Sequence, residues 1–205
     1  MSSEKQSSAS GLVRVRKAIA RYLTDSVVKL LVRISVTPNT LTWFGFILAV
    51  VAGWLIINGS FFAAGIVVLL AGFFDILDGA LARATNQTTR FGAVLDATLD
   101  RFSEAVLFFS IIVFYALRAD ERLVLLIALV GVTVAGSFMV SYIRARAESL
   151  GLDCQVGLFT RAERVIILTL GLWLNQLVIA LAIILVVSFI TVAQRLFHVW
   201  RQTEK

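Results

Sequence analysis

The chain has 205 residues, of which 59% are hydrophobic and only 16% are charged, and its formal net charge is +6. Soluble domains are usually about 45–50% apolar and about 25% charged, so this composition excludes an ordinary soluble domain and indicates an integral membrane protein. Because the basic residues flank apolar segments, the positive charge indicates contact with anionic lipid and no nucleic-acid partner.

The first segment, residues 1–37, is predicted to be a polar N-terminus followed by a juxtamembrane helix. From Leu12 to Ile34, apolar residues recur at helical spacing, and basic residues follow the same period on another face. This pattern is typical of an amphipathic helix lying in the membrane interface. The charges exclude the continuous apolar core of a signal peptide. Pro38 then breaks the helix, and Asn39 or Thr40 is expected to cap the next one.

The remainder, residues 38–205, is predicted to be one all-α domain. A membrane-crossing helix needs roughly 20 mainly apolar residues. Five longer apolar runs are good candidates, at residues 41–58, 61–82, 91–117, 123–143 and 177–197. A shorter apolar run at residues 162–174 is a weaker candidate for a span. We therefore expect a bundle of six transmembrane helices.

The positions of the basic residues predict the orientation of this bundle. Of the 19 Lys and Arg residues, 16 lie before residue 38, in the links near 83–90 and 144–164, or after residue 194. Cytoplasmic loops of membrane proteins carry the excess of Lys and Arg. Both termini are therefore expected to lie inside the cell.

One segment, "DILDGALARATNQTTRFGAVLDATLD" at residues 75–100, is unusually acidic for this chain. Asp75 and Asp78 are three residues apart, and Asp96 and Asp100 are four apart, so each pair lies on one face of a helix. The short polar link between the helices predicts an antiparallel hairpin that brings the four carboxylates together near the cytoplasmic surface. A charged side chain at the centre of a bilayer costs on the order of 2.5–3.5 kcal/mol, so these carboxylates need positive partners.

The sequence offers few such partners nearby. Arg83 is the best placed, with Arg90 and Arg101 as possible helpers. Carboxylates without His or Cys prefer a hard cation, Mg²⁺ or Mn²⁺, and such ions usually serve phosphate chemistry. A structural ion-pair cluster is the alternative, but acids with few matched bases leave costly unpaired charge. In the metal-site interpretation, Arg83 could hold a diphosphate and Thr89 could offer a hydroxyl to a phosphate or sugar.

The spacing D-x2-D-G-x2-A-R-x8-G-x3-D-x3-D over residues 75–100 resembles the signature of the CDP-alcohol phosphotransferase family. The resemblance implies two divalent ions, Mg²⁺ or Mn²⁺, held by Asp75, Asp78 and Asp96, with Asp100 contributing to the second ion and acting as the general base. It also implies a homodimer in a prokaryotic cell membrane that transfers the phosphatidyl group of CDP-diacylglycerol, or a related CDP-lipid, to an alcohol and releases CMP. The implied contacts of the CDP moiety are Asn39, Thr40, Leu41, Thr42, Gly79, Arg83 and Thr89.

Three basic segments, "SYIRARAESLGL", "TRAER" and "AQRLFHVW", resemble those of phosphatidylinositol phosphate synthases within this family. The resemblance implies that Arg144, Arg164 and Arg195 bind the phosphate of the acceptor, inositol 1-phosphate. Arg146 and Arg161 are interpreted as charges that flank a span. Because those relatives have lysine at the position of Arg144, proline at that of Ala162 and a Gly-Asp loop at "DCQVG", glycerol 3-phosphate stays open as the acceptor of a phosphatidylglycerophosphate synthase.

Two other classes of protein also place acidic residues in membrane helices. Membrane prenyltransferases carry two separated acidic motifs, whereas here both aspartate pairs lie on one hairpin. A metal-ion transporter could use the carboxylates as a transport site, but transporters often show inverted repeats, and the sequence shows no internal repeat. Both alternatives are therefore weaker than the transferase hypothesis.

Overall fold

A computed structural model describes residues 27–119, 121, 123–157 and 159–204. These residues form helices joined by short connections, so the predicted all-α class is confirmed. A helical segment at residues 27–33 comes first. The helices that follow are α2 (Pro38–Ile57), α3 (Phe61–Ala84), α4 (Arg90–Ala116), α5 (Leu123–Ser149), α6 (Arg161–Trp173) and α7 (Leu177–Thr203).

Among the described residues, α2, α3, α5 and α7 are long and apolar enough to cross a membrane. Helix α4 has 27 residues, but its first 15 residues include Arg90, Asp96, Asp100, Arg101 and Glu104. Helix α6 has only 13 residues, which corresponds to about 20 Å. Its length is therefore below the roughly 30 Å of a bilayer's hydrocarbon core.

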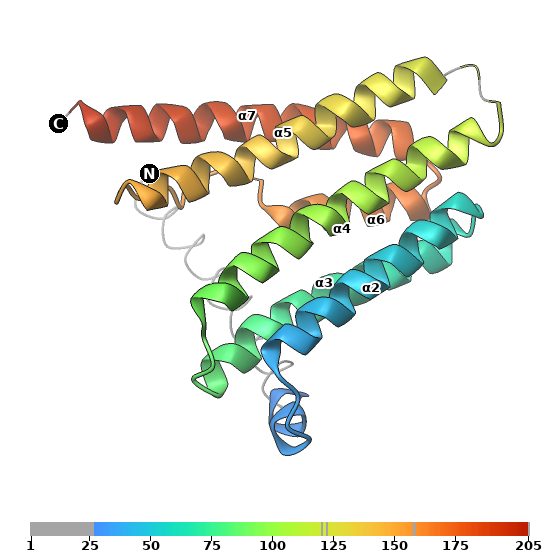
Figure 1. Ribbon diagram of the computed structural model, residues 1–205. Helices are drawn as coiled ribbons and strands as arrows, with labels where there is room; N and C mark the ends of the chain where they lie inside the picture. The colour runs from blue at the N-terminus through green and yellow to red at the C-terminus, as the bar shows by residue number, and fades with distance from the viewer. Residues whose placement is uncertain (1–26, 120, 122, 158, 205) are drawn as a thin grey trace, which may run out of the picture.

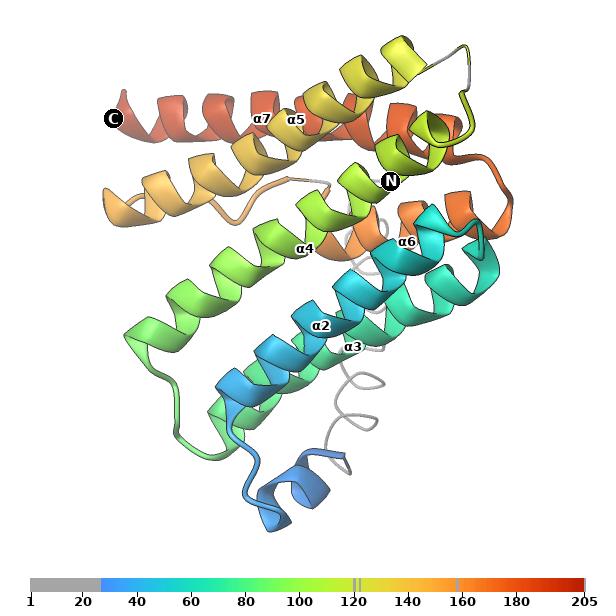
Figure 2. The ribbon, with the colours of Figure 1, turned by 45° about the vertical axis from the view of Figure 1, so that its right-hand side comes forward.

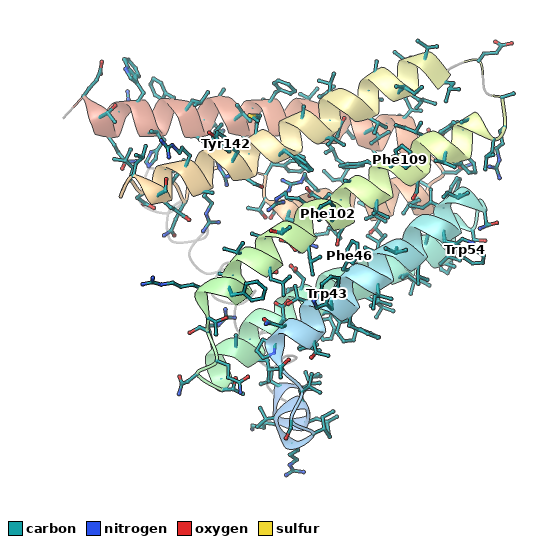
Figure 3. All side chains as sticks on the ribbon, viewed as in Figure 1. Trp43, Phe46, Trp54, Phe102, Phe109 and Tyr142 are labelled. Atoms are coloured by element: carbon teal, nitrogen blue, oxygen red, sulfur yellow. The ribbon has the colours of Figure 1, made fainter. Side chains whose placement is uncertain are left out.

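The outer surface of the helices is strongly apolar. Trp54 is 63% exposed and Phe109 is 64% exposed, and both side chains lie on the outside of the bundle (Figure 3). Exposed apolar surface on this scale marks contact with lipid or another protein. Together with the four apolar helices, it identifies an integral membrane protein.

The helices form two groups that diverge toward one end (Figures 1 and 2). Helix α2 packs against α3 and α4, whereas α5 packs against α7; α6 contacts both α3 and α7. The main hydrophobic core fills the space between the groups and includes Ile56, Ile111, Leu172 and Ile184. Since this core lies toward the connections at residues 58–60 and 174–176, the opposite end is left open for the site.

Helix starts at the open end are fixed by caps. Thr37 caps α2, accepting a hydrogen bond from the Thr40 backbone N–H at 3.4 Å, so the expectation that Asn39 or Thr40 is the cap was wrong. Pro38 instead takes the first helical position, where its missing N–H costs nothing. Thr89 caps α4, accepting from the Gly92 N–H at 2.9 Å.

The predicted interfacial helix falls mostly on residues 1–26, which lie outside the described residues. In the described part, Val28 is buried against Leu41, Leu77 and Leu81. Leu30 and Ile34 are exposed. The segment at residues 27–33 therefore packs one side on the ends of α2 and α3 and presents apolar side chains on another.

Candidate active site

The two acidic pairs meet between α3 and α4. One carboxylate oxygen each from Asp75, Asp78 and Asp96 lies within 4.8 Å of the others. Asp100, one helical turn beyond Asp96, is linked to Asp75 through an arginine that pairs with both. The predicted hairpin therefore brings all four carboxylates together.

The carboxylates of this cluster differ in how they are satisfied. Asp78 is 5% exposed and accepts a hydrogen bond from the Thr42 hydroxyl at 2.8 Å. Asp96 Oδ1 is buried and has no hydrogen-bond partner within the described part of the chain. Buried polar atoms are normally paired, and an orphaned oxygen beside two other carboxylates suits a hard divalent cation, which takes oxygen ligands. The residues present therefore fit Mg²⁺ or Mn²⁺.

The counter-charge in the cluster comes from Arg161, the first residue of α6. Its guanidinium forms ion pairs with Asp75 and Asp100. The interpretation of Arg161 as a flanking charge was therefore wrong. Arg83, expected as the main counter-charge, lies against Gly79 instead: a Cβ built on Gly79 would be 3.3 Å from an Arg83 guanidinium nitrogen.

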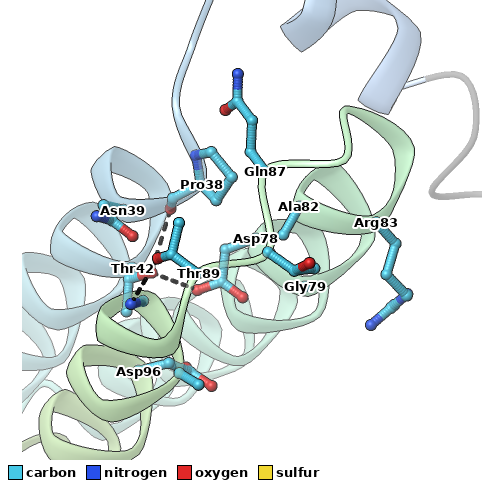
Figure 4. Close-up of a pocket in the computed structure, with 13 residues that line it drawn as sticks. Pro38, Asn39, Thr42, Asp78, Gly79, Ala82, Arg83, Gln87, Thr89 and Asp96 are labelled. Atoms are coloured by element: carbon cyan, nitrogen blue, oxygen red, sulfur yellow. Dashed lines mark hydrogen bonds between the residues drawn. The ribbon is translucent and has the colours of Figure 1, made fainter.

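A cavity of about 150 Å³ opens beside Asp78 and Asp96, among the starts of α2 and α4 and the end of α3 (Figure 4). Thr40 and Leu41 are not among the described residues that line it: the Thr40 hydroxyl bonds to that of Thr37 at 2.8 Å, and Leu41 is buried in the packing. The residues expected to contact CDP that do line the cavity are Asn39, Thr42, Gly79, Arg83 and Thr89.

The tight wall of this cavity depends on Gly92. A Cβ at this position would lie 2.9 Å from Thr89 Oγ1 and 3.2 Å from Asn39 Oδ1. A side chain here would therefore push α4 away from the start of α2 or displace the capping threonine. Glycine lets the polar groups of the two helix starts approach each other across the cavity.

A second cavity, of about 430 Å³, lies between α4, α5, α6 and α7. Asp96 and Asp100 line one side of it. The structure thus brings the predicted acceptor residues Arg144, Arg164 and Arg195 to one cavity, next to the acidic cluster. The arginines that line it are Arg101, Arg144, Arg161, Arg164 and Arg195.

Two of these arginines are deeply buried. Arg164 is 2% exposed, and its Nε donates to Glu104 Oε1 at 2.7 Å. Its Nη1 is buried and has no hydrogen-bond partner among the described residues. Arg195, 4% exposed, donates from Nε to the Val156 carbonyl at 2.9 Å. Both guanidinium groups are therefore held by the protein while facing the cavity.

Glu104 was not recognised as a site residue from the sequence. It is 5% exposed, and besides Arg164 it contacts Arg101 and the Ser137 hydroxyl, both at 3.5 Å. The only available signal was an acid in the middle of the third apolar run, four residues after Asp100. Its partner lies 60 residues further along the chain, so the spacing could not reveal the pair.

Residues 35–199 match the family model of CDP-alcohol phosphatidyltransferase. A phosphatidylinositol phosphate synthase from Mycobacterium marinum is 38% identical over 90% of this chain and 82% of its own length. An archaetidylinositol phosphate synthase from Pyrococcus horikoshii is 34% identical over 94% of this chain and 98% of its own.

Solved structures of the phosphatidylinositol phosphate synthase of Mycobacterium tuberculosis are similar in fold as well as sequence. The form with CDP-DAG bound is 36% identical, with a TM-score of 0.77, and the match covers 87% of this chain and 94% of that one. The form in complex with manganese and citrate has the same identity and TM-score, over 86% of this chain and 88% of that one. The chain therefore belongs to the CDP-alcohol phosphatidyltransferase family.

Proposed function

We propose that this protein transfers the phosphatidyl group of a CDP-diacylglycerol-type lipid to a hydroxyl of inositol 1-phosphate, giving phosphatidylinositol phosphate and CMP. The observation that carries the proposal is that the two cavities meet at the acidic cluster: Asp96 lines both. A nucleotide-linked lipid in the smaller cavity and an anionic acceptor in the larger one would thus reach the same carboxylates.

Asp75, Asp78 and Asp96 would hold two divalent ions, Mg²⁺ or Mn²⁺, with Asp100 contributing to the second. When bound, the ions would neutralise charge that develops on the phosphates during transfer. Support comes from the clustered oxygens and the orphaned Asp96 Oδ1, and from the manganese complex of the tuberculosis synthase.

The protein's own groups position both substrates. Asn39, Thr42, Gly79, Arg83 and Thr89 would hold the CDP moiety in the smaller cavity. Thr40 and Leu41 would contribute by fixing the first turn of α2. Asp100 would accept the proton of the acceptor hydroxyl as that oxygen attacks the β-phosphorus and CMP leaves.

The acceptor would be recognised by its phosphate. Arg144, Arg164 and Arg195 line one cavity, and guanidinium groups bind phosphate through strong, charge-assisted hydrogen bonds. Since the curated relatives above are named for inositol phosphate products from both phosphatidyl and archaetidyl lipids, inositol 1-phosphate is favoured over glycerol 3-phosphate.

The same proposal includes the arrangement in the membrane. Residues 38–205 would form one domain in which all six helices, α4 and α6 included, lie across the membrane of a prokaryotic cell. The N-terminal segment would lie in the interface, with both termini and the active site on the cytoplasmic side, where the basic helix ends gather. The family resemblance further suggests a homodimer.

The test is release of CMP by the purified protein given CDP-diacylglycerol, Mg²⁺ and one acceptor at a time. We expect turnover with inositol 1-phosphate and little with free inositol, because free inositol lacks the phosphate that the arginines would bind. Faster turnover with glycerol 3-phosphate would identify glycerol 3-phosphate, and not inositol 1-phosphate, as the acceptor. No CMP release with any phosphorylated polyol would refute the proposed reaction. Asp100→Asn is the inactive control.

A further inference from the structure

Arg161 divides the acidic cluster into two parts. Its guanidinium pairs with Asp75 from α3 and Asp100 from α4. The oxygens of Asp75, Asp78 and Asp96 lie within 4.8 Å of one another, and neither Asp78 nor Asp96 forms an ion pair with this arginine within the described residues. Asp78 and Asp96 are thus open to a cation, whereas Asp75 and Asp100 are already bridged by Arg161, so that Asp75 lies between the two parts.

A guanidinium and a divalent ion compete for the same oxygens. Mg²⁺ needs its carboxylate oxygens at about 2.1 Å, so a carboxylate that faces Arg161 must turn away from it to take the ion. An ion beside an undisplaced guanidinium would also face like-charge repulsion, which is strong in a poorly solvated site. Binding of a second ion through Asp75 and Asp100 therefore requires that Arg161 moves.

The larger cavity is the space next to Arg161, which lines it. The cavity already holds the guanidinium groups of Arg164 and Arg195, both almost fully buried. Arg161 Nε is itself buried and has no hydrogen-bond partner within the described part of the chain. If the Arg161 guanidinium moved in among these arginines, they would repel it, unless an anion occupied the cavity and accepted its hydrogen bonds.

We propose that Arg161 takes the place of the second divalent ion in the metal-poor protein, and that it is displaced into the arginine-lined cavity only when an anion binds there. The second ion and the acceptor's phosphate then bind cooperatively. This inference rests on the proposed function. It assigns Arg161 as a positioning residue that withholds the second ion until the acceptor has bound.

The first experiment counts Mn²⁺ bound to the purified protein by calorimetry, without CDP-lipid, so that no turnover occurs. We expect one tightly bound ion in the absence of anion and a second whose affinity rises about tenfold with inositol 1-phosphate, within the usual range of coupling between sites. By linkage, saturating Mn²⁺ should raise the affinity for inositol 1-phosphate by the same factor. Two ions bound equally well with and without anion would overturn the inference.

The second experiment removes the internal cation. Arg161→Gln should bind two Mn²⁺ ions without anion, and Mn²⁺ should raise its Tm more than that of the wild type. Arg161→Lys keeps one positive charge but places it on a compact ammonium at the end of a flexible stem, without the planar guanidinium, and should be intermediate. Arg146→Gln, which changes an exposed arginine of α5, is the matched control and should behave as wild type.

If Arg161→Gln does not fold, the titrations of the wild type and of Arg161→Lys still test the inference. Each of them depends on the same coupling between the second Mn²⁺ ion and the anion. An unchanged Mn²⁺ stoichiometry in a folded Arg161→Gln protein would show a purely structural ion pair and overturn the inference. Inorganic phosphate in place of inositol 1-phosphate separates the two proposals, because it offers the anion without an acceptor hydroxyl. Mn²⁺ coupling to inorganic phosphate, in a protein that releases no CMP from CDP-diacylglycerol with any phosphorylated polyol, would refute the proposed reaction and leave the role of Arg161 standing.

Discussion

The buried pair between Glu104 and Arg164 allows a quantitative test of how the acceptor site is built. Their side chains are only 6% and 3% exposed, and Arg164 Nη2 lies 2.7 Å from Glu104 Oε1. Arg144 and Glu148 offer a matched pair of the same chemistry at 2.8 Å, with side chains 51% and 50% exposed. Comparing Glu104→Gln with Glu148→Gln therefore isolates the effect of burial.

Glu104→Gln keeps the shape of the side chain but leaves the Arg164 guanidinium without its counter-charge. Removing one partner of a buried pair costs about 3–5 kcal/mol, and we expect the lower end of that range because glutamine still offers an oxygen to accept a hydrogen bond. The exposed Glu148→Gln should cost about 0.5 kcal/mol. At about 2–4 °C per kcal/mol for a chain of this size, Glu104→Gln should lower Tm several times more than Glu148→Gln.

Thermal unfolding of the purified variants in one detergent measures these shifts, and steady-state kinetics completes the test. The double variant Glu104→Gln/Arg164→Gln should be less destabilised than the sum of its single changes, because the charge left buried by one change is removed by the other. Glu104→Gln should also raise the acceptor's KM more than that of the CDP-lipid, since Arg164 loses its support. Equal Tm shifts for Glu104→Gln and Glu148→Gln, or strict additivity, would refute this reasoning.

Asp100→Asn should abolish CMP release while leaving CDP-lipid binding largely intact; lost binding with residual turnover would contradict its assignment as the base. Arg164→Ala should raise the acceptor's KM far more than the CDP-lipid's KM, and equal effects would contradict the pocket. Gly92→Ala should raise the CDP-lipid's KM, because its Cβ would lie 2.9 Å from Thr89 Oγ1, whereas Gly131→Ala, with nothing within 4 Å, should change neither KM. Chelation of divalent ions should stop turnover, and Mg²⁺ or Mn²⁺ should restore it; activity that survives chelation would contradict the metal site.

The sequence alone determined the helices and the acidic part of the site. Apolar runs with polar breaks predicted every helix from α2 to α7. A chain in a membrane must satisfy its backbone hydrogen bonds within each helix, and a membrane-crossing helix needs a continuous apolar run, so its length and position can be read from the local sequence. The aspartate pairs could be placed for the same reason. Spacings of three and four residues put side chains on one helix face, and a five-residue connection between α3 and α4 leaves little choice but an antiparallel hairpin.

Only the tertiary structure decided which charges meet. Arg161 lies 86 residues from Asp75, and Arg164 lies 60 residues from Glu104, so no local spacing links these partners. Arg161 reaches Asp75 because α6 packs against α3, and from the start of α6 both arginines also meet acids of α4: Arg161 meets Asp100 and Arg164 meets Glu104. A basic residue at a helix end has the same sequence pattern whether it faces lipid headgroups or turns inward. The position of the neighbouring helices, which depends on the packing of the whole bundle, makes that difference.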